Sequence, residues 1–452
     1  MAVCGSACGS NCVPKDTEGE EGERLKRLSL EEESSVRRCT KCAEEEARKE
    51  CNGLCAGCFR AYLYGKFKLA VTSNAMISPT DKVLVAFSGG PSSRVALEFI
   101  HEMQSKALAC WDASNSQALP VFTVGVVFME ECNISDELSD QADDVIAQIR
   151  SIVSGLSPPS KDLHIVPMES LFSSDLRKLV GSINDATGRE DFVRHLRMLS
   201  LQRVAFEFGY NKLVLGLSAS GIARHVLSAT VKGQGYSLPA DMQYVDTRWK
   251  APVVLPIRDC LEQELVTLCN LESLKHVQVH DKRCTSINGL VSSFIARLRE
   301  DNSSREHTIL RTAGKLKPFN FNKFSSNQYE YVPSRLRPKF QFIETGEPES
   351  PEVLCPICAS PLTATELATT RCSQQMKGLN IKEMEAFYLS CCQSCHFQIL
   401  PKEETSMSCD GFFDLLPKPM VKRSLLRLVV SYSMHFSTFT TTTKPFVPNK
   451  LG

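Results

Sequence analysis

The sequence predicts an α/β protein, a doubly wound parallel sheet flanked by small zinc-ribbon-like modules. Three observations lead to this prediction. Short apolar runs alternate with helical patterns between residues 68 and 345, a Ser-Gly-Gly turn follows the first run, and paired Cys-x-x-Cys motifs flank the region. Apolar runs separated by helices of a dozen residues or more specify βαβ units, which form a buried parallel sheet.

Each predicted strand is a short apolar run that leads into a helical pattern. The first strand, "VLVAF", precedes a helix that we expect from Ser92 to about residue 109. The other predicted strands are 121–128, 163–168, 212–217 and 252–257. The helices that follow them cover "DDVIAQIRSIV", "DFVRHLRMLSLQRVAFEFG", "GIARHVLSATV" and "RDCLEQELVTLC". Ligands of such sheets bind beyond the carboxyl ends of the strands, so a functional site is expected there.

Composition narrows the class of protein. The 452 residues include 52 basic and 52 acidic ones, so the overall charge favours neither nucleic acid nor membrane. No apolar run approaches the roughly 20 residues needed to cross a bilayer. The first residues contain scattered cysteines and then acids, with no apolar signal core, so we expect a cytoplasmic protein. Disulfides are rare in that reducing compartment, and the 20 cysteines therefore indicate metal binding or sulfur chemistry.

Shifts in composition divide the chain into five parts. The amino-terminal part is rich in Gly, Ser, Glu and Lys, and a Pro-, Ser- and Glu-rich stretch (344–352) precedes the second cysteine block. The predicted parts are a disordered tail (1–32), an N-terminal four-cysteine module (33–67), the α/β domain (68–345), a C-terminal four-cysteine module (346–410) and a flexible basic tail (411–452).

The cysteine spacing predicts two structural zinc sites. Two residues between cysteines let a tight turn direct both thiolates at one ion, and two such turns complete a tetrahedral four-thiolate site. The expected ligands are Cys39, Cys42, Cys55 and Cys58 in the first block and Cys355, Cys358, Cys392 and Cys395 in the second. Cys51 and Cys391 are alternative ligands. An iron–sulfur cluster is the rival interpretation, because four thiolates also suit one.

The stretch "KVLVAFSGGPSSR" (82–94) predicts a phosphate-binding turn. Glycines at 89 and 90 let the backbone present amide hydrogens to an anion, and the start of the following helix adds its positive dipole end. Ser88, Ser92 and Ser93 supply small hydroxyl groups around that turn. The turn contains no acidic residue, although an enzyme that handles ATP through magnesium usually needs one close by.

These features resemble one protein family. "VLVAFSGGPSS" is similar to the pyrophosphatase loop (SGG-x-D-S) of ATP-dependent ligases and tRNA sulfurtransferases. The order of the first cysteine block, "FRAYLYGKFKLAV", the loop, "YNKLVLGLSASGIARHVLSATVKGQG", "LPIRDCLEQEL" and the second cysteine block resembles the cytoplasmic tRNA 2-thiolation protein 2 family in a plant-like form. The resemblance covers roughly residues 37–410 and implies a pyrophosphatase-loop fold of the adenine-nucleotide alpha hydrolase type. The basic final tail does not match the family.

Active members of the wider superfamily carry acids and cysteines that this chain replaces. An Asp of the loop is replaced by Ser92, and a Gly-His-Asn-x-x-Asp-Asp stretch is replaced by "GLSASGIAR", with Leu217, Ser218, Ser220 and Gly221. The helix "EDFVRHLRM" lacks the Cys-x-x-Cys of active thiolases. Adenylation needs charge stabilisation by magnesium and carboxylates, and sulfur transfer needs a thiolate or cluster. No catalytic residue is therefore expected, and ATP and magnesium should bind at most weakly, at Ser88–Ser93.

The resemblance implies a non-catalytic subunit in the 2-thiolation of wobble uridine, which forms 5-methoxycarbonylmethyl-2-thiouridine in the tRNAs for Lys, Glu and Gln. It implies three partners: an active thiolase paralogue in a heterodimer, tRNA, and a ubiquitin-like sulfur carrier. No membrane partner is expected. The candidate contacts to RNA phosphates are Arg37, Arg38, Lys41, Lys232, Arg248, Lys250, Arg335, Arg337 and Lys339.

Two other functions fit the sequence. The chain could be an autonomous adenylating sulfurtransferase or ligase whose magnesium ligands come from elsewhere, with Asp81, Glu130 and Asp259 as candidates. It could also be a zinc-ribbon adaptor that binds nucleic acid or protein without any link to thiolation.

Overall fold

The computed structural model describes residues 38–113, 120–131, 139–172, 175–277, 285–302, 304–322, 353–368, 383–402 and 408–424. The expected disordered tail, the last 28 residues of the expected basic tail, and Arg37, Arg335, Arg337 and Lys339 lie outside these ranges. The chain forms two compact units, Met1–Ala61 and Tyr62–Gly452. No helix in the described part of the chain is long and apolar enough to span a membrane.

The first unit is built around its cysteines. Two isolated antiparallel bridges, Arg38 with Glu46 and Arg48 with Leu54, shape its turns. They surround a short 3-10 helix, η1 (Lys49–Cys51), and lead into helix α2 (Ala56–Ser73), whose first residues belong to this unit. Cysteines and Phe59 fill the interior, because a unit of this size has few other apolar side chains to bury.

The second unit contains a six-stranded sheet in the order β3-β2-β1-β4-β6-β5. Its strands are β1 (Lys82–Ala86), β2 (Thr123–Glu130), β3 (Asp162–Pro167), β4 (Lys212–Leu215), β5 (Val245–Asp246) and β6 (Val253–Val254). All neighbouring pairs are parallel except β5 with β6. The predicted mostly parallel α/β sheet is confirmed, and each of the five predicted runs contains a strand. The two-residue strand β5 is too short for its sequence pattern to predict.

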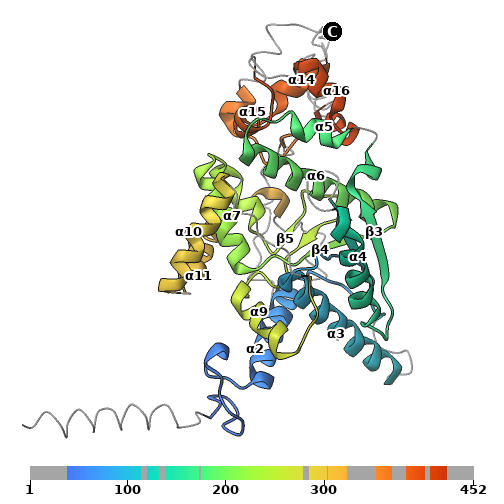
Figure 1. The fold of residues 1–452 in the computed structure, drawn as a ribbon, viewed down its shortest axis with the longest axis vertical. Helices are drawn as coiled ribbons and strands as arrows, with labels where there is room; N and C mark the ends of the chain where they lie inside the picture. Colours follow the sequence, from blue (N-terminus) through green and yellow to red (C-terminus); the bar gives the residue numbers. More distant parts are fainter. Residues whose placement is uncertain are drawn as a thin grey trace, which may run out of the picture. The chain divides into compact units, whose positions relative to one another are not determined.

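Helices lie between the strands along the chain (Figure 1). They are α3 (Pro91–Ala113), α4 (Ser139–Ser154), α5 (Leu176–Gly181), α6 (Ala186–Glu207), α7 (Ala219–Val231), α8 (Leu238–Asp241), α9 (Glu262–Leu271), α10 (Ile287–Asp301) and α11 (Ser304–Ala313), with 3-10 turns η2 (Met168–Leu171), η3 (Gly235–Ser237) and η4 (Asn320–Asn322). Side-chain caps start several of them; Asp185, for example, accepts a hydrogen bond from Gly188 N over 2.6 Å at the start of α6. Helix α6 packs on β2 and β4, whereas α10 and α11 pack on α7.

The second cysteine block is part of the same hydrophobic core as the sheet. Its helices are α14 (Glu383–Ser390), α15 (Gln393–Gln398) and α16 (Cys409–Leu415). Phe387 and Phe412 are fully buried in the cluster that also contains Phe192 of α6. A Cβ atom on Gly188 would lie 1.9 Å from the carbonyl oxygen of Gln398, so α6 and α15 approach each other closely. Met420 is buried in the same core, and the packed chain therefore continues beyond residue 410, where we expected a flexible tail to begin.

Candidate functional site

The predicted phosphate-binding turn lies where the sequence places it, between β1 and α3. Gly89 has a φ of +86°, a backbone conformation that favours glycine. The hydroxyl of Ser93 donates to the carbonyl of Gly90 over 2.9 Å and lies 3.1 Å from the hydroxyl of Ser88. These serines therefore hydrogen-bond within the turn, and Ser93 is buried. Ser92, at the position of the missing acid, is half-buried.

Val277, from the segment after α9, packs directly on this turn. Its amide donates to the carbonyl of Gly89 over 2.9 Å. A Cβ atom on Gly89 would lie 3.0 Å from the Cβ of Val277 and 3.4 Å from the Cδ1 of Ile149. Packing inside the protein thus requires a glycine here, whether or not the turn binds an anion.

The second motif, at the end of β4, lies beside the first. A Cβ atom on Gly216 would lie 2.5 Å from the Cα of Ser93, so the two segments that the resemblance singles out are in contact. Ser218 caps α7 by accepting a hydrogen bond from Gly221 N over 3.2 Å. Neither Ser218 nor Gly221 carries a charge, and the pair serves to start the helix.

Ser220 joins three helices in the interior. Its hydroxyl donates to Oε2 of Glu306 over 2.7 Å and accepts from the amide of Glu262 over 3.1 Å. Both Ser220 and Glu306 are completely buried, which connects α7, α9 and α11. Matched residue by residue, the motif of active members has its two acids at Gly221 and Ile222, and Ser220 is the variable position before them. Sequence reasoning did not find Glu306, since a single Glu in an amphipathic helix gives no signal of burial.

The three alternative magnesium ligands do not converge. Asp81 precedes β1 and accepts from Ser78 N over 2.7 Å, at the amino end of the strand. Glu130 ends β2. Asp259 accepts from the hydroxyl of Tyr244 over 2.8 Å, and burial together with Asp259 raises the pKa of Tyr244 to about 12. Among the described residues, the groups of three or more metal-ligating side chains are the two cysteine quartets, and neither contains a carboxylate.

The cysteines near the predicted site are unreactive thiols. Cys260 follows β6, and its carbonyl accepts from Ala219 N at the start of α7 over 2.8 Å. Burial raises the pKa of Cys260 to about 12 and the pKa of Cys269 to about 11. Both are therefore protonated near neutral pH, whereas sulfur transfer needs a thiolate. This part of the site cannot supply a sulfur nucleophile.

The two predicted cysteine quartets are each brought together. In each quartet all four sulfur atoms lie within 4.8 Å of one another. In the first quartet, Sγ of Cys42 lies 3.9 Å from Sγ of Cys55. In the second, Cys355 and Cys395 are 3.8 Å apart and Cys358 and Cys392 are 3.6 Å apart. A tetrahedral ion with zinc–sulfur distances of about 2.3 Å requires sulfur atoms about 3.8 Å apart, so the spacing fits one ion per quartet.

The alternative ligands lie outside the quartets. Cys391 directs its sulfur at the carbonyl of Phe387 over 3.3 Å, and its neighbour Cys392 belongs to the second quartet. Cys51 is buried in the first unit but is not a member of the first quartet. The spacing in "CCQSC" allows either neighbour as a ligand. The structure places Cys392, the N-cap of α15, in the quartet.

Two arginines lie next to the second quartet. Arg423 donates to the carbonyl of Pro356 over 3.5 Å, and its guanidinium stands 5.1 Å from the centre of the Trp249 ring. Arg248 donates to the carbonyl of Ala359 over 3.2 Å. Four thiolates around a divalent ion carry excess negative charge, and nearby guanidinium groups stabilise it.

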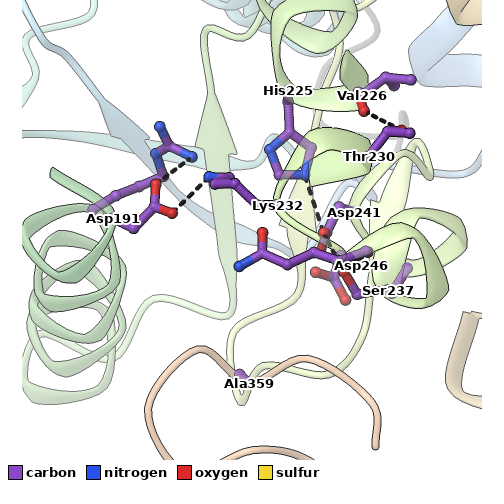
Figure 2. Close-up of polar contacts among 12 residues, drawn as sticks. Asp191, His225, Val226, Thr230, Lys232, Ser237, Asp241, Asp246 and Ala359 are labelled. Carbon is purple, nitrogen blue, oxygen red and sulfur yellow. Dashed lines mark hydrogen bonds and ion pairs between the residues drawn. The ribbon is translucent and has the colours of Figure 1, made fainter. Parts of the chain in front are cut away.

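Two of the predicted RNA contacts are instead interior ion pairs. Lys232 lies 2.6 Å from Asp191 (Figure 2), and both side chains are at most 2% exposed. Lys232 keeps the pKa of the Asp191 carboxyl low in spite of burial, so the pair is ionised. Arg248 pairs with Asp241 and Asp246, each over 2.6 Å. The prediction that these two side chains contact RNA is wrong, because their charges are already paired inside the protein.

The other described basic candidates lie at the surface. Lys250 is exposed, with its ammonium 4.8 Å from the centre of the Phe206 ring. In the first unit, Arg38 and Lys41 are exposed, and Arg38 donates to the carbonyl of Ala43 over 3.4 Å. These three residues remain available for phosphate contacts.

Comparisons with known proteins agree with the motifs. No family model matches the chain. It is 56% identical to cytoplasmic tRNA 2-thiolation protein 2 of Oryza sativa subsp. indica over 407 residues, which cover 88% of this chain and 86% of the relative. The Arabidopsis thaliana protein of the same name is 46% identical over 442 residues, covering 94% of each chain. Among solved structures, the U34-tRNA thiolase NcsA from Methanococcus maripaludis, solved with its [4Fe-4S] cluster, matches with a TM-score of 0.50 and 18% identity over 62% of this chain and 86% of that one.

The likeness to NcsA concerns the fold, and it agrees with the pyrophosphatase-loop architecture expected from "VLVAFSGGPSS". The alignments to the plant relatives cover 88% and 94% of the chain. The chain belongs to the cytoplasmic tRNA 2-thiolation protein 2 family.

Proposed function

We propose that this chain is a non-catalytic subunit of a cytoplasmic complex that 2-thiolates the wobble uridine of tRNA. The names of its relatives support the pathway and the compartment. We further propose that an active thiolase paralogue is its partner in a heterodimer and that a ubiquitin-like carrier supplies the sulfur. The proposed organisation is two small zinc modules around one pyrophosphatase-loop domain, with tRNA held by the assembled pair.

The observation that carries the non-catalytic role is the loss of acids from the motif positions. Ser92 stands at the position of the loop Asp, and Gly221 and Ile222 stand at the positions of the acidic pair. Adenylation develops charge that magnesium and carboxylates must stabilise. Among the described residues, no group of three or more metal-ligating side chains contains a carboxylate. We propose that ATP and magnesium bind there weakly at most.

We propose one structural zinc ion in each cysteine quartet. The observed sulfur–sulfur distances of 3.6 to 3.9 Å match the edges of a tetrahedron around a single ion. The thiolates of a [4Fe-4S] cluster each bind a different iron and therefore stand farther apart. Both quartets are closed four-thiolate sites with no open position, so zinc in them would stabilise the fold and take no part in chemistry.

Pyrophosphate release tests the catalytic part of this proposal. The purified chain alone, mixed with ATP, magnesium and unmodified tRNA, should release no pyrophosphate above background, while addition of the paralogue and of the sulfur carrier as its thiocarboxylate should give release and thiolation. Robust release by the chain alone would make it an autonomous enzyme.

Genetics tests the pathway separately. Deletion of the gene should remove 2-thiouridine from bulk tRNA, and reintroduction of the chain should restore it. Unchanged 2-thiouridine in the deletion strain would favour an adaptor unrelated to thiolation.

A further inference from the structure

Three aromatic side chains form a row beside the end of α7. The rings of Tyr236 and Phe319 meet edge to face at 5.4 Å between centres. Phe319 and Phe321 stack with centres 5.5 Å apart and planes inclined by 10°. Tyr236 is 50% exposed and the two phenylalanines are half-buried, so the row presents ring surface to solvent. Single exposed apolar side chains are common, but a contiguous group of exposed rings is typical of a binding site.

The turn that carries Tyr236 is held in place on two sides. Lys232, just before it, is fixed by the buried ion pair with Asp191. Gln234 donates to the hydroxyl of Ser394 in α15 over 2.9 Å. Gly233 and Gly235 lie in open space, because a Cβ atom at either position would meet nothing within 4 Å. Tyr236 thus stands on a fixed turn with room around its backbone.

The segment that carries the two phenylalanines is fixed to the sheet edge at β5. The Thr247 hydroxyl donates to the carbonyl of Phe321, and the Thr247 amide donates to Oδ1 of Asn322 over 3.4 Å. Asn322 donates in turn to the carbonyl of Ala240 over 3.3 Å. The guanidinium of Arg248 lies 5.8 Å from the centre of the Phe321 ring. A row positioned in advance loses little conformational freedom when a ligand binds to it.

The charge around the row is positive. From residue 307 to residue 322 the chain contains no acid and three strongly basic residues, Arg311, Lys315 and Lys317. All three are exposed, and none forms an ion pair with another described residue. Lys317 is two residues from Phe319, which limits their Cα atoms to about 7 Å apart. The acids near the row, Asp241 and Asp246, are already paired with Arg248.

We propose that this row, Tyr236 with Phe319 and Phe321, binds unpaired nucleotides of RNA by stacking, while Lys315 and Lys317 contact the adjacent phosphates. Exposed aromatic rings beside free cations are typical of single-stranded nucleic-acid binding, where each base stacks on a ring and the backbone follows the charge. The choice of RNA rests on the proposed role in tRNA thiolation. A protein partner is the alternative ligand for the exposed rings, but free lysines without acids favour a polyanion.

The test measures the affinity of the full-length chain, together with its co-purified partner, for a fluorescent RNA stem-loop with an open loop. Tyr236→Ala should weaken binding by about fivefold to a hundredfold, the range measured for loss of one base-stacking ring. Tyr236→Phe keeps the ring and should retain affinity. Lys315→Gln with Lys317→Gln should weaken binding and reduce its salt dependence.

Phe208→Ala is the matched control. Phe208 is 52% exposed and also packs against a ring, His164, at 4.0 Å, but it lies at the opposite edge of the sheet, beside β3. This variant should bind RNA as the unmodified protein does. Melting temperatures of all variants separate loss of the ring from loss of the fold.

Several outcomes would overturn the inference. Unchanged RNA affinity of Tyr236→Ala would do so and leave the role in thiolation intact. Equal affinity for a fully paired RNA duplex would exclude stacking on unpaired bases. Loss of the co-purified partner with RNA affinity unchanged would make the row a protein interface. Failure of the proposed function shows itself differently, as normal 2-thiouridine in cells that lack the chain.

Discussion

Ser220 donates a hydrogen bond to Glu306 over 2.7 Å, and both residues are completely buried. The position just before the acidic pair of the motif is thus a buried contact between α7 and α11 in this protein. Ser220→Asp would face the Glu306 carboxylate with a second one and should lower the free energy of unfolding by at least about 3 kcal/mol.

Chemical denaturation measures this effect, and a second variant checks its cause. Adding Glu306→Gln to Ser220→Asp removes one of the two facing carboxylates and should recover part of the lost stability. If Ser220→Asp instead unfolds at the same denaturant concentration as the unmodified chain, the contact between Ser220 and Glu306 is not the buried one described here.

Gly89→Ala tests whether packing requires a glycine in the turn. A Cβ atom there would lie 3.0 Å from Val277 on a backbone with a φ of +86°. Strain and overpacking together should lower the free energy of unfolding by about 2–4 kcal/mol. At Gly90 the nearest atom, Oγ of Ser88, is 3.8 Å away, and Gly90→Ala should cost less than about 1 kcal/mol. Equal effects of the two substitutions would contradict this explanation.

Lys232→Met should damage the fold. The substitution leaves Asp191 buried without its partner, and breaking a buried pair in this way costs about 3–5 kcal/mol. Lys250→Met, at an exposed site, is the control and should cost less than about 1 kcal/mol. Thermal unfolding of both variants is the measurement, and a Lys232 variant as stable as the Lys250 variant would return Lys232 to the list of candidate RNA contacts.

Metal content shows which of the two adjacent cysteines in "CCQSC" binds a metal ion. The full-length chain should contain two zinc ions, one for each quartet, and no iron. Cys392→Ser should remove one ion and lower the melting temperature. Cys391→Ser should keep both, because the Cys391 sulfur is directed at the Phe387 carbonyl. Elemental analysis by mass spectrometry measures zinc and iron per chain. Four or more iron atoms per chain would indicate an iron–sulfur cluster in place of zinc.

Stability should fall at acidic pH through Asp241. Burial raises the pKa of Asp241, but Arg248 and His225 outweigh it and hold the pKa below the ordinary value. A carboxyl whose pKa is depressed in the folded state stabilises the protein above its unfolded pKa of about 4, and this stabilisation disappears as the pH falls below that value. Asp241→Asn should be less stable at pH 7 and show a flatter acid limb. Parallel pH profiles of both proteins would assign acid unfolding to other groups.

The strand pattern and the cysteine spacing could be predicted from the sequence because each is a local signal. "VLVAF" forms β1 since its apolar side chains fit a buried strand, and Cys355 and Cys358 face one point because a tight turn separates them. The buried state of Lys232 and Arg248 could not be predicted. Their partners Asp191 and Asp241 are 41 and 7 residues away in the chain. The sequence alone does not distinguish a basic side chain in an ion pair from one that is free.

By itself the sequence determined the family, five strands that each lead into a helix, and the eight cysteines that form the two quartets, because periodicity and spacing are properties of neighbouring residues. The tertiary structure decided which charges are available and what the remnants of the nucleotide motif now do. Ser220, Ser93 and Gly89 are satisfied by Glu306, Gly90 and Val277. The partners of Ser220 and Gly89 come from distant parts of the chain that only folding brings within hydrogen-bonding distance.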